Sequence, residues 1–323
     1  MKKVYAILLS ILMVFGLAAC SDKKESNENT GSYKVGVGSV TSISANNYDA
    51  EEDKNGRVQY NTTYAALVVD GEGKIVYLAI DTAQNTAVVE AGGVVVPGSD
   101  MRTKKELKEE YNMVGASGIG KEWYEQIAAL ETYAIGKTVE EFISTANDDA
   151  DLATSVTIDI MDYIEAVRKA NENLVAVENG VTYGVGSVTS WKASSYNADD
   201  EKNGSAQINT TFAFVVLNAE GKMVYVAIDT AQFSSSIDAE GTVSIGSDTR
   251  TKKEQKEDYG MAGISGIGKE WYEQIAALEA YAIGKTVEEF VSTASDDADL
   301  TTSVTIDIAA YIEALEKAVN NVE

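Results

Sequence analysis

Apolar and polar residues follow two periods along this chain, and each pattern occurs twice. Short runs rich in Val, Ile, Tyr and Phe predict strands, and two of them flank a glycine-containing turn in the manner of a β-hairpin. The strands expected are Val35–Val40, Tyr64–Val69 and Ile75–Ile80, and later Val185–Val188, Phe212–Leu217 and Met223–Ile228. Each set is followed by residues at helical spacing, so strands precede helices twice.

The helical patterns are also duplicated. Apolar residues recur every three or four positions in Lys121–Tyr133, and Thr138 followed by Glu141 is typical of a capping box that opens a helix. The charged segments Thr103–Tyr111 and Thr251–Tyr259 predict solvent-exposed helices, and apolar stripes starting at Ile160 and Ile308 predict a terminal helix in each copy. This order of elements predicts an α+β fold in which each copy has a small antiparallel sheet with helices.

The duplication is a tandem repeat of whole domains. Residues 35–170 recur as residues 183–318 without a net insertion, which predicts a domain at 33–172, a linker at 173–181 and a domain at 182–323. The copies are unequally alike, because Gly118–Ile160 and Gly266–Ile308 differ at only four positions, whereas the first halves differ much more. Uneven drift explains this pattern, and so does a working surface in the second half.

Composition excludes several classes of function. The formal charge of −25 argues against nucleic acid as a partner and would repel anionic lipid headgroups. The chain has no histidine, which argues against haem ligation, zinc hydrolase chemistry and a Ser-His-Asp triad. Its single cysteine, Cys20, cannot form a disulfide within the chain.

The N-terminus predicts a lipid-anchored secreted protein. Residues 1–19 have a short basic start and an apolar stretch that ends Leu17-Ala18-Ala19-Cys20, which resembles the lipobox of bacterial lipoproteins. Cys20 would then be the lipidated first residue of the mature chain, and the polar residues 20–32 would be a flexible tether. This places the folded part at the outer face of the cytoplasmic membrane.

One heptapeptide occurs in both copies ahead of the expected terminal helix: Asp151–Thr157 and Asp299–Thr305. It resembles the flavin-attachment motif of FMN-binding domains, Asp-x-x-(Ser/Thr)-Gly-Ala-Thr followed by a helix with spaced alanines. The matching positions are Asp151, Thr154, Thr157, Ala166 and Ala170, and Asp299, Thr302, Thr305, Ala314 and Ala318. Two positions depart from the motif: Ser155 and Ser303 replace its glycine, and Val156 and Val304 replace its alanine. The rest of the chain is similar to the tandem-domain flavinylated lipoproteins of Gram-positive extracellular electron transfer, the pheromone-encoding lipoprotein type.

The resemblance implies FMN joined to Thr157 and to Thr305 through a phosphoester, made by a secreted flavin transferase that uses FAD and Mg²⁺. The chain would carry electrons from a membrane NADH dehydrogenase and quinone pool to extracellular acceptors such as ferric iron. A helix N-terminus suits a phosphate, although Asp159 and Asp307, expected in the first helical turn, would repel one. Lys104, Lys105, Lys252 and Lys253 are candidates to offset that repulsion. Further candidates to contact the flavin are Gly118, Gly266, Trp123, Trp271, Met113 and Met261.

Each of these residues also has a purely structural interpretation. Thr157 and Thr305 fit helix N-caps, the tryptophans fit a core, the methionines fit gap-fillers and the glycines fit a tight turn. The acidic run Asp49–Asp53 fits a solvated loop. Two other functions therefore stay open: a lipoprotein module that binds a ligand or partner without redox work, and a flavin reductase with noncovalent FMN.

Overall fold

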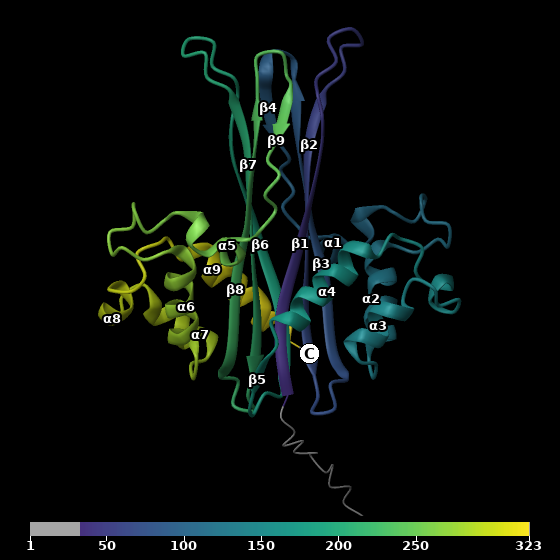
Figure 1. Ribbon diagram of the computed structural model, residues 1–323, viewed down its shortest axis with the longest axis vertical. Coiled ribbons are helices and arrows are strands. Elements are labelled where there is room, and N and C mark those ends of the chain that lie inside the picture. Colours follow the sequence, from purple (N-terminus) through teal and green to yellow (C-terminus); the bar gives the residue numbers. More distant parts are fainter. Residues whose placement is uncertain (1–32, 323) are drawn as a thin grey trace, which may run out of the picture. The chain divides into compact units, whose positions relative to one another are not determined.

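The computed structural model describes residues 33–322, and each repeat in it is a long-stranded antiparallel sheet with helices on one face (Figure 1). The α+β class is therefore confirmed. The predicted signal peptide, the lipidation site Cys20 and the tether lie outside the described residues. No helix in the described part of the chain is long and apolar enough to cross a membrane.

The first sheet has the strand order β4-β3-β2-β1-β5 and the second has the order β6-β7-β8-β9. The strands of the first are β1 Tyr33–Asn46, β2 Gly56–Val69, β3 Ile75–Glu90, β4 Val94–Pro97 and β5 Val175–Val177. Those of the second are β6 Thr182–Ser194, β7 Gly204–Leu217, β8 Met223–Ile237 and β9 Val243–Ile245. The hairpins predicted around residues 70–74 and 218–222 are present, but their strands have 14 to 16 residues, which is more than twice the expected length. The residues predicted as a linker, 173–181, include β5, which pairs with β1.

The helices follow the strands in the same order in both repeats. The first repeat has α1 Lys104–Leu107, α2 Trp123–Ala134, α3 Val139–Thr145 and α4 Met161–Glu172, with 3₁₀ turns η1 Ala91–Gly93, η2 Lys108–Tyr111 and η3 Leu152–Thr154. The second has α5 Lys252–Gln255, α6 Trp271–Ala282, α7 Val287–Ala294, α8 Ala298–Thr301 and α9 Ala309–Asn320, with η4 Lys256–Tyr259. The capping boxes predicted at Thr138 and Thr286 are confirmed.

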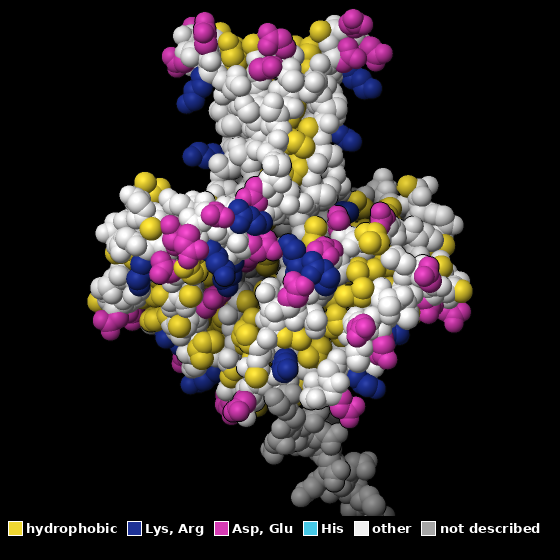
Figure 2. Space-filling view, viewed as in Figure 1, with side chains coloured by type: hydrophobic (Ala, Val, Ile, Leu, Met, Phe, Trp, Pro, Cys, Tyr) yellow, Lys and Arg dark blue, Asp and Glu magenta, His cyan; other side chains and the backbone are white. Residues whose placement is uncertain are grey.

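The charged segments are helical, as predicted, but each is a four-residue α-helix followed by a 3₁₀ turn, and the α-helical part is only partly exposed to solvent. Thr103, which caps α1, is 2% exposed, and the Lys105 ammonium forms an ion pair with Glu131 of α2 at 2.6 Å. The segment packs against the sheet because its polar groups find partners on β3 and α2. The acidic run Asp49–Asp53, by contrast, lies in an exposed loop between β1 and β2, as expected of a solvated loop, and Figure 2 shows acidic side chains gathered there.

The terminal helix of each repeat lies very close to the first strand. A Cβ added to Gly36 would come within 2.2 Å of the Ala170 carbonyl oxygen, and one added to Gly38 within 2.3 Å of the Ala170 nitrogen. Gly184 and Gly186 have the same relation to Ala318 in α9. Glycine in the strand and alanine in the helix therefore permit this close packing, which gives the motif alanines a structural role of their own.

The faces of the two sheets that bear no helices pack against each other. One shared apolar cluster joins residues of both repeats, including Val58 and Val89 from the first and Ile208 and Phe233 from the second. Tyr64 and its counterpart Phe212 stack on each other, with ring centroids 5.3 Å apart. Since equivalent residues meet, a pseudo-twofold axis passes between them, and the two repeats share a core that sets their relative orientation.

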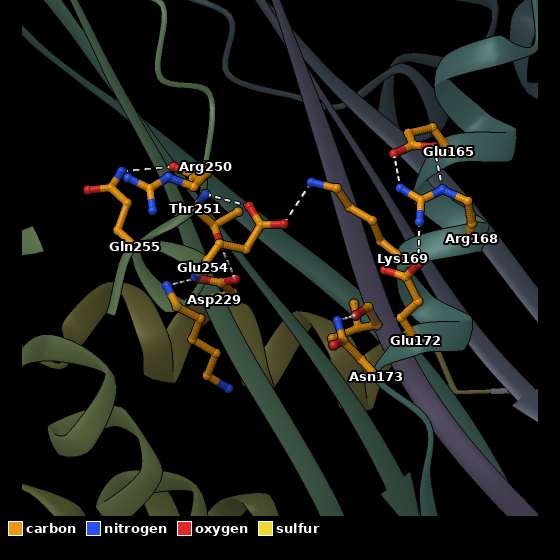
Figure 3. Close-up of polar contacts among 12 residues, drawn as sticks. Glu165, Arg168, Lys169, Glu172, Asn173, Asp229, Arg250, Thr251, Glu254 and Gln255 are labelled. Carbon is orange, nitrogen blue, oxygen red and sulfur yellow. Dashed lines mark hydrogen bonds and ion pairs between the residues drawn. The ribbon is translucent and has the colours of Figure 1, made fainter. Parts of the chain in front are cut away.

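Polar contacts between the repeats obey the same symmetry. The Lys169 ammonium of α4 lies 2.7 Å from the Glu254 carboxylate of α5, as Figure 3 shows, and the Lys317 ammonium of α9 lies 2.8 Å from the Glu106 carboxylate of α1. Tyr60 adds a bond without a counterpart, because its hydroxyl donates to the Ala206 carbonyl at 2.8 Å. The two ion pairs join the terminal helix of one repeat to the first short helix of the other, and the Tyr60 bond joins β2 to β7.

Candidate functional site

The heptapeptide Asp151–Thr157 forms the connection between α3 and α4, and its two apolar side chains hold it to the core. Leu152 is 6% exposed and Val156 is 7% exposed, and both belong to the apolar cluster beneath the helices. Val156 stands where the family motif has alanine, so the larger side chain fills core space. Thr157 follows directly and is exposed, as is Thr305 in the second repeat.

A buried glutamine of α2 holds this threonine. The Gln126 Oε1 accepts the Thr157 amide N–H at 2.8 Å and the Thr157 hydroxyl at 3.3 Å, and it also accepts the Ile158 amide N–H at 3.3 Å. Gln274 accepts the amide and hydroxyl of Thr305 at 2.9 and 3.3 Å. The sequence interpretation missed these glutamines, although a glutamine on the apolar face of a helix, three residues after Trp123 and again three after Trp271, was a visible signal.

The motif aspartate contributes its main chain to the turn, while the cap comes from another residue. Asp149 Oδ1 accepts the amide N–H groups of Asp151 and Leu152 at 3.0 and 2.8 Å, and Asp149 Oδ2 accepts the Tyr133 hydroxyl at 3.0 Å. The Thr154 hydroxyl donates to the Asp151 carbonyl at 2.7 Å. Asp297, Tyr281 and Thr302 repeat this arrangement around Asp299. The Asp151 and Asp299 side chains are exposed, beside half-buried Ser155 and Ser303.

Asp159 binds the first amide of α4, and two expectations about the start of this helix are wrong. Thr157 is not the N-cap, because Ile160 occupies that position and the helix begins at Met161. Asp159 does not lie in the first turn, since it precedes the helix and its Oδ1 accepts the Met161 amide N–H at 3.0 Å. Asp307 accepts the Ala309 amide N–H in the same way at 2.9 Å. Each carboxylate thus accepts the hydrogen bond of a helix N–H group that would otherwise be free to bind an anion.

One hollow lies near the start of the terminal helix in each repeat. In the first repeat, one of about 180 Å³ lies between the sheet and the start of α4, and polar side chains line it: Ser42, Asn61, Thr63, Thr82, Gln84, Lys104, Asp159, Asp162 and Tyr163. In the second, a hollow of about 270 Å³ is bordered by Thr305 itself, with Val304, Ile306, Asp307 and Ile308.

Each lysine pair is divided between two roles. The Lys104 ammonium lies 5.0 Å from the ring centre of Tyr111 and 5.3 Å from that of Trp123, and it lines the same hollow as Asp159. Burial lowers the pKa of Lys104 to about 8, and that of Lys252 also to about 8. Lys105 and Lys253 point elsewhere, because they pair with Glu131 and Glu279. Of the first pair, Lys104 is therefore the lysine that lines the hollow beside Asp159, and Lys252 lies over the equivalent rings of Tyr259 and Trp271.

The remaining candidates are parts of the scaffold around the site. Trp123 and Trp271 are each 1% exposed, and their indole N–H groups donate to the hydroxyls of Tyr163 and Tyr311 at 2.8 and 2.9 Å. Burial raises the pKa of both tyrosines to about 12. Both tryptophans therefore lie in the core, between α2 and α4 or between α6 and α9.

The glycine-containing loop ahead of α2 forms a tight turn. Glu122 accepts the amide N–H groups of Met113 and Val114 at 2.8 and 3.2 Å, and the Ser117 hydroxyl accepts that of Lys121 at 3.3 Å. Met113 packs against the core edge, as Met261 does in the second repeat. A Cβ on Gly118 or Gly266 would meet open space. Most loop amides thus already have partners in the protein.

Comparisons with models of known protein families, with curated proteins and with solved structures find no match for this chain. The described residues contain no group of three or more Asp or Glu side chains arranged to hold a metal ion.

Proposed function

We propose that this protein is a lipid-anchored electron carrier at the outer face of the cytoplasmic membrane, with FMN esterified to Thr157 and Thr305. One observation carries the proposal. The same threonine occurs in both repeats at the end of the same heptapeptide, as an exposed residue whose main chain is fixed by a buried glutamine. A threonine retained for packing alone would not need to be exposed.

The surroundings of the threonine fit a flavin phosphate in two respects. A hollow of about 270 Å³ borders Thr305, close to the lower limit of about 300 Å³ typical of small-molecule pockets, and it is open enough for a ring to extend into solvent. In the first repeat, the half-buried Lys104 ammonium lines the hollow beside Asp159. That cation would offset the repulsion between Asp159 and a phosphate, and a bound phosphate would raise its lowered pKa.

The chemistry would belong to the flavin, which accepts and donates one or two electrons, while the chain supplies position and electrostatics. Electrons would enter from a membrane NADH dehydrogenase and quinone pool and leave to acceptors such as ferric iron. A secreted flavin transferase using FAD and Mg²⁺ would attach the cofactor. A covalent bond suits a protein outside the cell, where a dissociated cofactor is lost by dilution.

The test is the mass of the mature chain made together with its flavin transferase. We expect two additions, each of one FMN minus one water, and a fluorescent band on a denaturing gel. Thr157→Ala and Thr305→Ala should each remove one addition, and the double variant should remove both. Thr132→Ala is the matched control and should retain both, because it removes an exposed hydroxyl of α2 where the second repeat naturally has alanine.

The other outcomes separate the alternatives. Flavin that leaves the chain on denaturation would favour a flavin reductase with noncovalent FMN. A chain that carries only its lipid after exposure to active transferase would refute the carrier and leave a binding module.

A further inference from the structure

A fully buried amide lies on the otherwise apolar face of the second helix of each repeat. Gln126 and Gln274 are 0% exposed and lie between tryptophan and isoleucine side chains of the core. Burying an amide without partners costs about 1–3 kcal/mol, so such a residue is kept only where its hydrogen bonds matter. Both glutamines use all their donor and acceptor positions in hydrogen bonds that join the end of the heptapeptide to the loop ahead of the helix.

The orientation of each amide is fixed by its partners. Gln126 Nε2 donates to the Lys121 carbonyl at 3.3 Å, which can only accept, and to the Ser117 hydroxyl at 3.2 Å. Gln126 Oε1 faces the Thr157 amide N–H, which can only donate. Gln274 has the same arrangement with Lys269, Ser265 and Thr305. The oxygen of each glutamine is therefore directed at the threonine.

We propose that Gln126 and Gln274 position the acceptor hydroxyls for flavin attachment, an inference that rests on the proposed function. Because the Thr157 hydroxyl donates its hydrogen inward to Oε1, its lone pairs face solvent, where an incoming phosphorus approaches. The hydrogen bonds from the backbone N–H groups of Thr157 and Ile158 to Oε1 fix the position of the threonine backbone relative to α2. A hydroxyl held in this way needs less ordering to reach the transition state.

The step is a phosphoryl transfer from FAD bound to the transferase. A bond forms between Thr157 Oγ1 and the phosphorus on the flavin side of the pyrophosphate. The bond from that phosphorus to the bridging oxygen breaks, and AMP leaves with its electron pair. The hydroxyl proton passes to a base of the transferase or to water, since a neutral amide does not take it. After transfer, the hydrogen bond from the Thr157 hydroxyl to the glutamine is lost, but the hydrogen bonds from the backbone N–H groups of Thr157 and Ile158 remain.

The experiment compares the two threonines within one chain. Gln126→Leu and, separately, Gln274→Leu are made in the full-length protein and incubated with transferase, FAD and Mg²⁺. Peptides carrying Thr157 and Thr305 are then separated and quantified by mass spectrometry over time. Glu131→Leu serves as the control for loosening, because it also replaces a largely buried polar side chain of α2 but one that contacts Lys105 and Ile80 instead of the site.

We expect Gln126→Leu to slow loading at Thr157 about tenfold while Thr305 loads at the normal rate, and Gln274→Leu to give the reverse. Tenfold corresponds to about 1.4 kcal/mol, the scale of one hydrogen bond. In single-site chains, the kcat of the transferase should fall while the KM for the chain stays within twofold, because the exposed surface is unchanged.

Three results would overturn the positioning role: unchanged loading in both variants, equal loss at both threonines, or equal slowing by Glu131→Leu. A wild-type chain that takes no flavin at either threonine would instead defeat the proposed function. The two failures are therefore distinguishable in one experiment.

Discussion

Replacing Phe214 by alanine should destabilise the first repeat, although the residue belongs to the second. Phe214 is 0% exposed and lies in the cluster between the two sheets. Its ring stacks on Tyr77 of the first repeat, with centroids 6.3 Å apart, and meets Tyr225 of its own sheet edge-on at 5.8 Å. The substitution therefore empties space that both repeats border.

The size of the effect follows from the burial. Truncating a fully buried phenylalanine to alanine typically costs about 3–5 kcal/mol, from lost transfer free energy and the cavity left behind. For a unit of this size, about 2 °C of melting temperature is lost per kcal/mol, so we expect a decrease of about 6–10 °C. If the sheets form one cooperative core, this loss applies to the unfolding of both repeats.

Hydrogen exchange followed by mass spectrometry can measure the two repeats separately, because their strand sequences differ. Peptides from β1 to β3 report the first repeat, and peptides from β6 to β8 report the second. Phe290→Ala is the matched comparison, since it removes the same side chain from the helical core of the second repeat. In a cooperative unit, both variants lower the protection of β2 and β3.

Unchanged exchange in β1 to β3 of the Phe214→Ala protein would refute the shared core. The repeats would then unfold as independent domains, each stable with one sheet face exposed. Two separate melting transitions, with only one of them shifted, would lead to the same conclusion.

Two further predictions concern the axis and the buried carboxylates. The Tyr64 hydroxyl donates to the Ser187 hydroxyl at 2.9 Å, so Tyr64→Phe should lower the free energy of unfolding by about 1–3 kcal/mol. Its counterpart Phe212 borders a hollow of about 360 Å³ that Ser39 also lines, so Phe212→Tyr should raise the free energy of unfolding by about 1 kcal/mol. Urea unfolding measures both. Burial raises the pKa of Asp229 from 3.8 to about 6, so the stability contributed by its protonation is complete below about pH 4 and is lost as the pH rises through about 6. Asp229→Asn should remove up to about 3 kcal/mol of this dependence, measured as unfolding free energy between pH 4 and 8, and an unaltered pH profile would contradict the assignment.

The helices were predictable because their signals are local. Thr138 and Glu141 satisfy each other's backbone N–H groups within one turn, so the capping box is complete in four residues. The predicted strands are too short because a continuous apolar run covers only part of each strand. In β2, every residue from Thr63 to Val69 is buried, since helices cover one face and the other sheet covers the second. At the start of β2, Arg57 and Gln59 alternate with buried Val58 and Tyr60, because no helix covers that end of the strand.

The heptapeptide and its threonine are visible in the sequence, but the hydrogen bonds that hold the threonine could not be read from the heptapeptide. Gln126 lies 31 residues away from Thr157, and the sequence does not state that α2 packs beneath the segment. The oxygen that binds the turn amides belongs to Asp149, two residues before the heptapeptide begins at Asp151. The pairing of Gln126 with Thr157 depends on tertiary packing and has no local pattern, whereas the turn at Asp149 is local, because its bonds span only two and three residues.

The unequal divergence of the two repeats also has a physical cause in the fold. Tyr60 and Trp191 meet edge to face across the sheets at 5.8 Å, and their counterparts are Ile208 and Ile43 in the same cluster. The large pair Tyr60 and Trp191 lies on one side of the pseudo-twofold axis, and the small pair Ile43 and Ile208 lies on the other. Two identical sequences would have to place pairs of the same size on both sides. Divergence in the strands therefore follows from packing two copies of one sheet face to face. The nearly identical segments 118–160 and 266–308 carry α2 and α3, or α6 to α8, and the threonines, and these helices lie on the outer sides of the sheets (Figure 1). Near identity there is what we expect if a single transferase must recognise both.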